Sequence, residues 1–241
     1  MRPDIVNLRQ FYSSRLGRTV KERLATVARR YWPTHSGEII LGVGYTLPIL
    51  RALERTGPGT ILTLMPAAQG AIYWPIDQDN RSILADEMRP PFAPGSVSRL
   101  TMLHALEHVA KPDELLRMAW DILEPGGQLL LAVPNRHGLW ARYGNTPFTS
   151  GTPYTFSALK TMLNEVGFTL RETGAALYAP PSTHPLFLQC SGLLEWLGHL
   201  FLPRGGGLIV IEAEKQIFAG VGERLQTGKW KFSPAPQAQG I

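Results

Sequence analysis

The sequence predicts an α/β protein built on an open, doubly wound and mostly parallel sheet. Short apolar runs typical of strands alternate with stretches that have helical spacing along most of the chain. The run "QLLLAVP" is continuously apolar, as expected of a strand that helices cover on both faces. In "GEIILGVGYTLPIL", a β-type run meets Gly42, Val43 and Gly44 and is followed by an apolar stretch that can open a helix. Strands and helices in this alternating order favour a parallel sheet between helical layers.

The elements of the first half follow from periodicity and from Gly and Pro. Apolar residues at helical spacing predict a helix over 16–31, which Pro33 closes. Residues 66–81 lack a clean helical period and predict a loop-rich connection. We expect strands at 38–41, 60–65, 82–86 and 97–103 and a helix at 47–53.

In the second half, Asp113 is the expected N-cap of a helix that ends before "EPGG". Thr155 can open another helix, which Gly167 stops. The expected strands are 128–134, 168–179 and 207–216, and residues beyond about 219 are expected to be loosely ordered.

Composition limits the class of protein. The chain has 241 residues, of which 44% are hydrophobic and 18% charged, so we expect one folded domain with extensions. Its net charge of +5 is compatible with an anionic partner, whether nucleic acid, lipid or an acidic protein. A single cysteine, Cys190, excludes an internal disulfide and favours a reducing compartment. The beginning of the chain lacks an apolar stretch of signal-peptide length, so we expect the protein in the cytoplasm.

The segment "LFLQCSGLLEWLGHLFL", residues 186–202, is the most apolar in the chain. It is too short and too polar to span a bilayer. A lipid anchor that lies on the membrane surface would need a polar face richer in Lys and Arg than this segment has. We therefore favour packing in the core or between subunits, including a homodimer through this helix.

The predicted sheet itself indicates where a ligand binds. In open α/β sheets, ligands bind at the carboxyl ends of the strands, where the strand order reverses. That rule places residues 42–46, Met65, Asp86 and residues 103–108 around one crevice.

Three stretches in fixed order carry a resemblance to a known family. "ADEMRPPFAPGSV", "LTMLHALEHVAKPDELLRMAWDILEPGGQLLLAVPN" and "GGGLIVIEAEK" resemble segments of class I S-adenosylmethionine-dependent methyltransferases of the small-molecule (type 11) group. The resemblance covers roughly residues 37–215. It implies a seven-stranded Rossmann-like sheet whose last strand is antiparallel between strands five and six, and S-adenosylmethionine as cofactor.

The resemblance also implies roles for individual residues. Gly42, Val43 and Gly44 would let the backbone approach the methionine and ribose of the cofactor, and Asp86 with Glu87 would contact the adenine. The carboxyl end of strand four would form the cofactor wall, with Met102, Leu103 and His104. A tight strand-to-helix turn for the glycines, and a cap for Asp86, are the structural alternatives.

Three departures from the family pattern bear on cofactor binding. Ile40 and Met65 stand where the family has acids, Met65 at the position that contacts the ribose, and Thr46 replaces a third glycine. Losing one hydrogen bond to a charged group costs about 1.5–3 kcal/mol. Neighbouring polar residues are candidates to compensate: Glu38, Gln69, Asp77 and Asp79.

A nicotinamide enzyme is the less satisfactory alternative. The dinucleotide motif requires glycine at Leu47 and an acid about 20 residues further on, where Met65 stands.

The candidate chemistry centres on strand four and on the loop after strand five. His104 is the candidate general base, whereas Glu107 and His108 are expected to cap or orient the following segment. In the loop, Trp140, Arg142 and Tyr143 are candidates to stack on and orient a planar or anionic acceptor, with packing over the sheet edge as the alternative. The six histidines show no paired spacing, so we expect no metal site.

The expected organisation is a basic helical lid over 1–36, a methyltransferase-like domain over 37–218 with an apolar insert at 184–203, and a tail over 219–241. The lid helix would cover the crevice, attract an anionic partner or, least favoured, bind nucleic acid. Two functions remain open: methyl transfer to a small-molecule or lipid-like acceptor, and a catalytically inactive relative that serves as a binding or scaffold protein.

Overall fold

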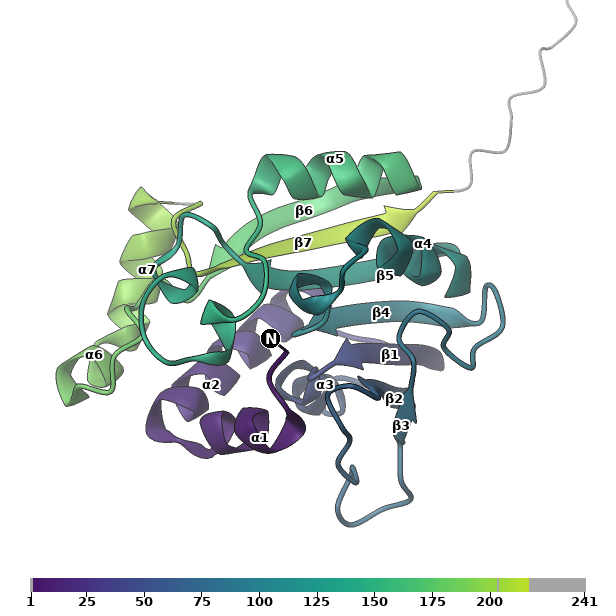
Figure 1. Cartoon of the computed structure of the whole chain (residues 1–241), viewed down its shortest axis with the longest axis horizontal. Helices are drawn as coiled ribbons and strands as arrows, with labels where there is room; N and C mark the ends of the chain where they lie inside the picture. Colours follow the sequence, from purple (N-terminus) through teal and green to yellow (C-terminus); the bar gives the residue numbers. More distant parts are fainter. Residues whose placement is uncertain (1, 203, 217–241) are drawn as a thin grey trace, which may run out of the picture.

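The structure, a computed structural model, describes residues 2–202 and 204–216. Seven strands form one sheet in the order β3-β2-β1-β4-β5-β7-β6 (Figure 1). β7 is antiparallel to both β5 and β6, and the other neighbours are parallel. The expected sheet and its antiparallel last strand are therefore confirmed. The strands are β1 (Glu38–Gly44), β2 (Gly59–Pro66), β3 (Ser82–Ala85), β4 (Val97–Leu103), β5 (Leu123–Pro134), β6 (Phe168–Ala176) and β7 (Leu208–Lys215).

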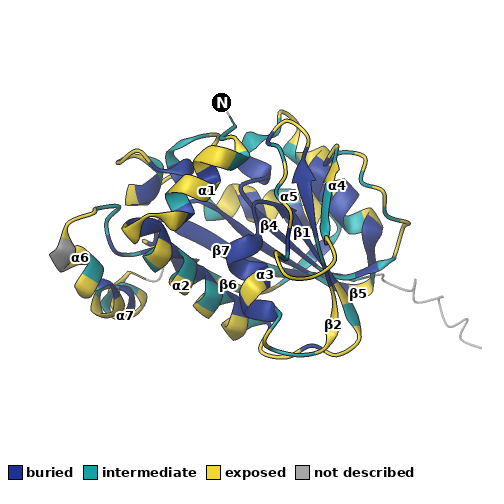
Figure 2. Ribbon diagram, turned by 90° about the horizontal axis from the view of Figure 1, so that it is seen from below, coloured by how far each residue is buried: buried dark blue, intermediate teal, exposed yellow. Residues whose placement is uncertain are grey.

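Helices cover both faces of this sheet, and the buried strands lie between them (Figure 2). Along β1 the side chains alternate between two cores, because Ile40 packs with residues of α1, α2 and α3, whereas Leu41 and Val43 pack with residues of α4 and α5. The helices are α1 (Ile5–Ser13), α2 (Arg15–Tyr31), α3 (Leu47–Leu53), α4 (Pro112–Ile122), α5 (Phe156–Val166), α6 (Pro185–Gln189) and α7 (Ser191–Phe201), with short 3₁₀ turns at Leu106–His108, Leu139–Ala141 and Pro147–Thr149. Among the described helices, none has the length and apolar character needed to cross a bilayer.

The caps explain several helix boundaries. Thr155 accepts a hydrogen bond from the backbone N–H of Ala158 at 3.3 Å, and Gly167 ends α5 at φ 105°, so both predictions at this helix are confirmed. The prediction for Asp113 is wrong. α4 begins at Pro112 with Lys111 at the N-cap, and Asp113 lies in the first turn, where the helix dipole favours a carboxylate.

α1 was not predicted, because its sequence has a weak apolar period. It joins α2 at Ser14, an extended residue whose hydroxyl accepts from the N–H of Gly17 at 3.0 Å. Gly17 is required at this corner, since a Cβ there would lie 1.9 Å from the carbonyl oxygen of Phe11. The prediction for the tail falls on residues outside those described.

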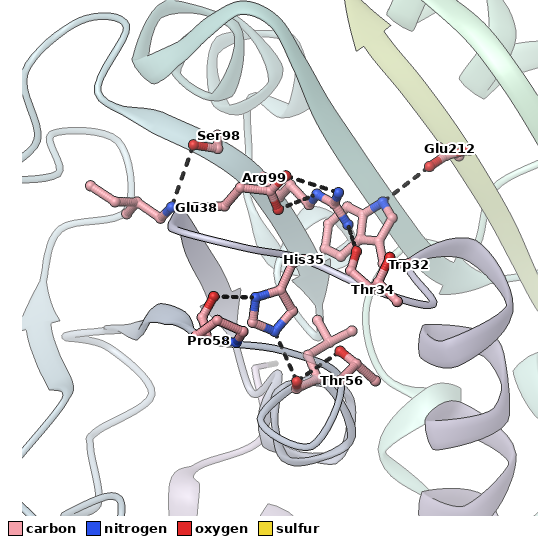
Figure 3. A network of polar contacts seen from close by, with 11 residues as sticks. Trp32, Thr34, His35, Glu38, Thr56, Pro58, Ser98, Arg99 and Glu212 are labelled. Carbon is pink, nitrogen blue, oxygen red and sulfur yellow. Dashed lines mark hydrogen bonds and ion pairs between the residues drawn. The ribbon is translucent and has the colours of Figure 1, made fainter.

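The amino ends of the strands are joined by a polar network (Figure 3). The guanidinium of Arg99 on β4 makes a two-pronged contact with Glu38 on β1, with Nε–Oε2 and Nη2–Oε1 distances of 2.8 and 3.0 Å. It also lies over the ring of Trp32, whose indole N–H donates to Glu212 on β7 at 3.0 Å. Glu38 is therefore paired with Arg99 at the end of the sheet opposite the crevice. The prediction that it compensates for a missing cofactor acid is wrong.

Candidate functional site

The strand order reverses between β1 and β4, and the carboxyl ends of these two strands lie side by side. Gly44 is the register partner of Leu103, and Val43 that of Met102. β2 lies on the other side of β1 and brings Met65 to the same end of the sheet. The structure thus brings together the glycine loop, Met65 and the residues after strand four, as the strand order predicts.

The glycine loop is closed by the chain's own side chains. All residues from Leu41 to Leu50 are buried. A Cβ at Gly42 would lie 2.0 Å from Oγ1 of Thr46, and one at Gly44, where φ is 90°, would lie 2.3 Å from the carbonyl oxygen of Leu103. Thr46 thus occupies the space that the glycine leaves. Both glycines are needed for the packing of β1, α3 and β4.

An aromatic stack from α1 fills the crevice next to this loop. The ring of Tyr12 lies against that of Tyr45, with centroids 5.2 Å apart and planes 18° apart. The hydroxyl of Tyr12 is 2.8 Å from Nε2 of His104, and Phe148 packs on the other side of the imidazole at 4.8 Å. Tyr12 is 2% exposed and His104 is fully buried. Together with the buried Met65, these side chains occupy the place where strands β1, β2 and β4 end.

The contacts of Tyr12 and Glu107 favour one tautomer of His104. Burial raises the pKa of Tyr12 well above its usual range, with Tyr45 and Glu107 adding to the shift, so the phenol stays neutral and can donate. Nε2 of His104 then accepts, which assigns the ring proton to Nδ1, 3.5 Å from Oε1 of Glu107. Burial alone would raise the pKa of Glu107, but the adjacent imidazoles of His104 and His108 outweigh it, so that pKa is lowered and the carboxylate is ionised. The result is a buried chain from Tyr12 through His104 to Glu107.

His104 has two further properties of a functional residue. Its φ of 55° lies in the left-handed region, which a non-glycine residue adopts at a cost and which occurs often at active sites. Nδ1 of His104, both carboxylate oxygens of Glu107 and Nε2 of His108 are buried without a hydrogen-bond partner that meets normal geometry. The ligand atoms of these three residues lie within 4.8 Å of one another. The statement that the histidines lack paired spacing is wrong for His104 and His108, which are four apart; that no metal binds there stays a prediction.

The segment of residues 2–13, which we call the N-terminal segment, also covers the ends of β2 and β3. Arg2 forms an ion pair with Glu87 at 2.5 Å, and the N–H of Ile5 donates to the carbonyl of Gln69 at 2.8 Å. Gln69 is 2% exposed, and its amide nitrogen and oxygen have no partner among the described residues. Glu38, Gln69, Asp77 and Asp79 are the candidates to replace the missing cofactor acids. Of these, Gln69 has buried polar side-chain atoms without a partner. Asp86 is exposed, and its Oδ1 caps the turn at Met88 N at 2.9 Å.

The predicted acceptor residues occupy different environments. Trp140 is 2% exposed, its indole N–H donates to the carbonyl of Ala179 at 2.7 Å, and its ring packs against Phe148. Tyr143 is 63% exposed, and the guanidinium of Arg142 donates to the carbonyl of Arg136 at 3.1 Å. Trp140 therefore packs inside the structure against Phe148, whereas Tyr143 is open to solvent.

A cavity of about 560 Å³ lies on the outer side of the tyrosine stack. Tyr12 and Tyr45 form one wall, and three cations from three different segments converge on it: Arg9, Lys21 and Arg51. The pKa of Lys21 is lowered by partial burial and by the charges of Arg51 and Arg18, which indicates crowded positive charge. Sequence analysis missed this cavity because its cations are far apart in the chain.

The sheet order and the crevice define a class I methyltransferase-type protein, and comparison with known proteins agrees. A family model described as "Methyltransferase domain" matches residues 53–173, and the chain belongs to this family. No curated protein matches the sequence. The family is one of methyltransferases, so membership implies methyl transfer as the class of reaction and S-adenosylmethionine as the methyl donor of the family.

Solved structures show the same fold at low identity. A chain from the complex between the Haloferax volcanii Trm112 methyltransferase activator and a methyltransferase matches with a TM-score of 0.63 and 15% identity, over 88% of this chain and 95% of that one. A Thermotoga maritima structure described as a possible histamine N-methyltransferase matches with a TM-score of 0.61 and 14% identity, over 88% and 96%. The Burkholderia thailandensis 1,6-didemethyltoxoflavin N1-methyltransferase, solved with S-adenosylhomocysteine, matches with a TM-score of 0.52 and 13% identity, over 82% and 78%.

S-adenosylmethionine does not fit the crevice as the side chains lie. Thr46 fills the space above Gly42, and Tyr12 and Tyr45 fill the space beside Gly44 and His104. Met65 is fully buried and offers no acceptor for ribose hydroxyls. Two kinds of obstruction are therefore present: Tyr12 belongs to α1, whereas Thr46 and Met65 belong to the sheet and its loops.

Proposed function

We propose that the chain is an S-adenosylmethionine-dependent methyltransferase for a small acceptor that carries a hydroxyl group and a negative charge, and that α1 closes its crevice until ligands bind. The observation that supports this proposal most is the buried chain from Tyr12 through His104 to Glu107.

In this row of three side chains, the hydroxyl of Tyr12 occupies the position that the hydroxyl group of an acceptor would take. A general base must lie within about 2.6–3.2 Å of the proton that it removes. Nε2 of His104 meets this condition toward Tyr12, and the ionised Glu107 behind Nδ1 would stabilise the imidazolium that forms. His104 therefore has the geometry of a base for an acceptor that replaces Tyr12.

The cavity beyond Tyr12 supports the nature of the acceptor. Its volume of about 560 Å³ lies within the range usual for small-molecule sites. Arg9, Lys21 and Arg51 favour an anionic group, and the wall also contains Leu47 and Ile72, which suit an apolar or lipid-like portion. If Tyr12 moved away, this cavity would open toward His104.

Movement of α1 is compatible with its attachment. α1 and α2 are separate helices joined at the extended Ser14, while α2 is anchored independently by its buried Val20 and Leu24. Opening would expose Leu8 and Tyr12, at a cost of about 1.5–3 kcal/mol for each side chain. Ligand binding of ordinary micromolar strength, about −8 kcal/mol, exceeds this cost.

Isothermal titration with S-adenosylmethionine and S-adenosylhomocysteine tests the proposal. We expect Tyr12→Ala, which removes the occluding ring, to bind more tightly than the unaltered chain by about tenfold or more. Tyr12→Phe keeps the ring and serves as the matched control, with a smaller gain. Absence of binding at millimolar ligand by both the unaltered chain and Tyr12→Ala would contradict it.

A non-catalytic binding or scaffold role is the second candidate, and Thr46 favours it. Its side chain fills the space above Gly42 from within the sheet framework, and no movement of α1 removes it. Adding Thr46→Gly to Tyr12→Ala separates the two candidates. Recovery of binding only in the double variant would indicate a site lost through Thr46, and no binding in any variant would favour the scaffold.

A further inference from the structure

The segment formed by α6 and α7 turns its apolar side chains away from the protein. Of the thirteen large hydrophobic side chains that are exposed among the described residues, six belong to residues 187–202, with exposed fractions from 39% to 70%. They are Phe187, Leu193, Trp196, Leu200, Phe201 and Leu202. Of the two expected environments, the core and a subunit interface, the core is therefore wrong for these side chains.

Polar contacts hold α7 in this orientation. Its inward face carries Ser191 and Glu195, which are 6% and 8% exposed. Oε1 of Glu195 accepts from the backbone N–H of Tyr178 at 2.8 Å. Gly198 allows the helix to approach the ring of Tyr178, where a Cβ would lie 2.3 Å from the ring. A helix of a globular protein normally points its apolar stripe to the core, so the outward stripe of α7 requires another apolar environment.

Basic residues of α2 border this apolar face. Nη2 of Arg23 donates to Oγ of Ser191 on the inward face of α7 at 3.2 Å, across a sequence separation of 168 residues, which places α2 beside α7 (Figure 2). The exposed Arg15 and Arg18 line one hollow together with Leu188 of α6, and Glu22 is the one acid in that lining. α1 and α2 contain seven basic residues and one acidic residue. Between residues 184 and 205 the sequence has one acidic residue, Glu195, and it points inward.

We propose that the outward face of α6 and α7, with Arg15 and Arg18 at its border, docks on the surface of an anionic lipid membrane. Helices that lie in the membrane interface combine an apolar face with Lys and Arg beside it, and Trp is enriched at that depth. The segment 186–202 lacks those cations in its own sequence, and Arg15 and Arg18 of α2 supply them in the fold. Symmetric pairing with a second copy would instead bring two Arg-rich borders close together, which like charges oppose.

Vesicle binding by the full chain tests this surface independently of the proposed methyl transfer. We expect cosedimentation with vesicles of phosphatidylcholine and phosphatidylglycerol, and much weaker binding to phosphatidylcholine alone. Trp196→Ser with Leu200→Ser, and separately Arg15→Glu with Arg18→Glu, should each weaken binding to the mixed vesicles by roughly tenfold or more. Two matched controls remove similar side chains elsewhere and should leave binding unchanged: Ile76→Ser with Leu84→Ser, and Arg89→Glu with Arg117→Glu.

A second measurement reports the depth of Trp196 in the membrane without changing the docking face. Trp196 fluorescence, taken as the difference between the unaltered chain and Trp196→Phe, should be quenched by lipids brominated along their acyl chains. Equal binding by the Trp196/Leu200 variant, or absence of this quenching on bound vesicles, would overturn the proposal. A dimer in solution that the same variant disrupts, together with no vesicle binding, would also overturn it and assign the face to a second copy.

Discussion

The hydroxyl of Tyr12 lies 2.8 Å from Nε2 of His104, and this contact joins residues 92 positions apart in the chain. It links the first helix to the end of β4, at the centre of the crevice. The same contact fills the crevice and orients His104, the base of the proposed function. Part of the obstruction of the crevice therefore comes from α1, and the rest comes from Thr46 and Met65.

Tyr12→Phe should lower the free energy of unfolding by about 1–2 kcal/mol, because Nε2 of His104 would then be a buried acceptor without a donor. Urea denaturation at pH 7 measures the change. Tyr73→Phe is the matched control: its hydroxyl donates to the carbonyl of Gln78 at 2.7 Å, but the ring is 57% exposed, so we expect a loss of no more than about 0.5 kcal/mol. Equal losses of unfolding free energy for both variants would show that the buried hydrogen bond of Tyr12 contributes no more than the exposed one of Tyr73.

His108 should make stability depend on pH. Burial lowers its pKa from 6.5 to about 4; Glu107 opposes this shift, and the neighbouring His104 and Arg2 add to it. Between these values the unfolded chain binds the proton and the folded chain does not, so stability is lost as the pH falls from about 7 toward 4. His108→Gln should reduce the fall in melting temperature over this range, whereas His137→Gln, at an exposed site, should not. A profile that His108→Gln leaves unchanged would exclude this histidine as the cause.

Arg99→Lys should destabilise the protein by about 1 kcal/mol, although the charge is retained. The two-pronged contact with Glu38 and the position over Trp32 depend on the planar guanidinium, which an ammonium cannot replace (Figure 3). Arg30→Lys is the control, because its pair with Glu172 is exposed and exposed pairs contribute little. Thermal unfolding of both variants measures the difference, and a larger loss for Arg30→Lys would contradict the assignment.

The strands and the order of the elements could be predicted from the sequence, because local patterns of apolar residues and caps determine them. Continuous apolar runs, Thr155 and Gly167 marked strands and caps without any tertiary information. The ends of β1, β2 and β4 could likewise be placed around one crevice, because parallel strands align their carboxyl ends.

The occupants of that crevice could not be predicted, because they depend on tertiary contacts. Tyr12 lies on a helix with a weak apolar period, and its partner His104 gives no local signal. The orientation of α7 depends on Tyr178 and Arg23, which come from other elements. Glu38 is likewise only a few residues from the glycine loop in the sequence, but it lies at the other end of β1, away from the crevice.

Gly42→Ala should destabilise the protein by about 2 kcal/mol or more, because the new Cβ would lie 2.0 Å from Oγ1 of Thr46 and 2.8 Å from its Cβ. If the glycine serves packing against Thr46, then Thr46→Gly should rescue a large part of this loss, even though it removes a buried side chain near Thr63. A double-mutant cycle in urea isolates the coupling between the two positions, and we expect a coupling free energy of about 1–2 kcal/mol. Gly44→Ala is the control, since its Cβ would meet the carbonyl of Leu103 at a φ of 90°, and Thr46→Gly cannot relieve that contact. Additive effects at Gly42 and Thr46 would show that the loop keeps its glycine for a reason other than Thr46, and close approach of a ligand would then be the better explanation.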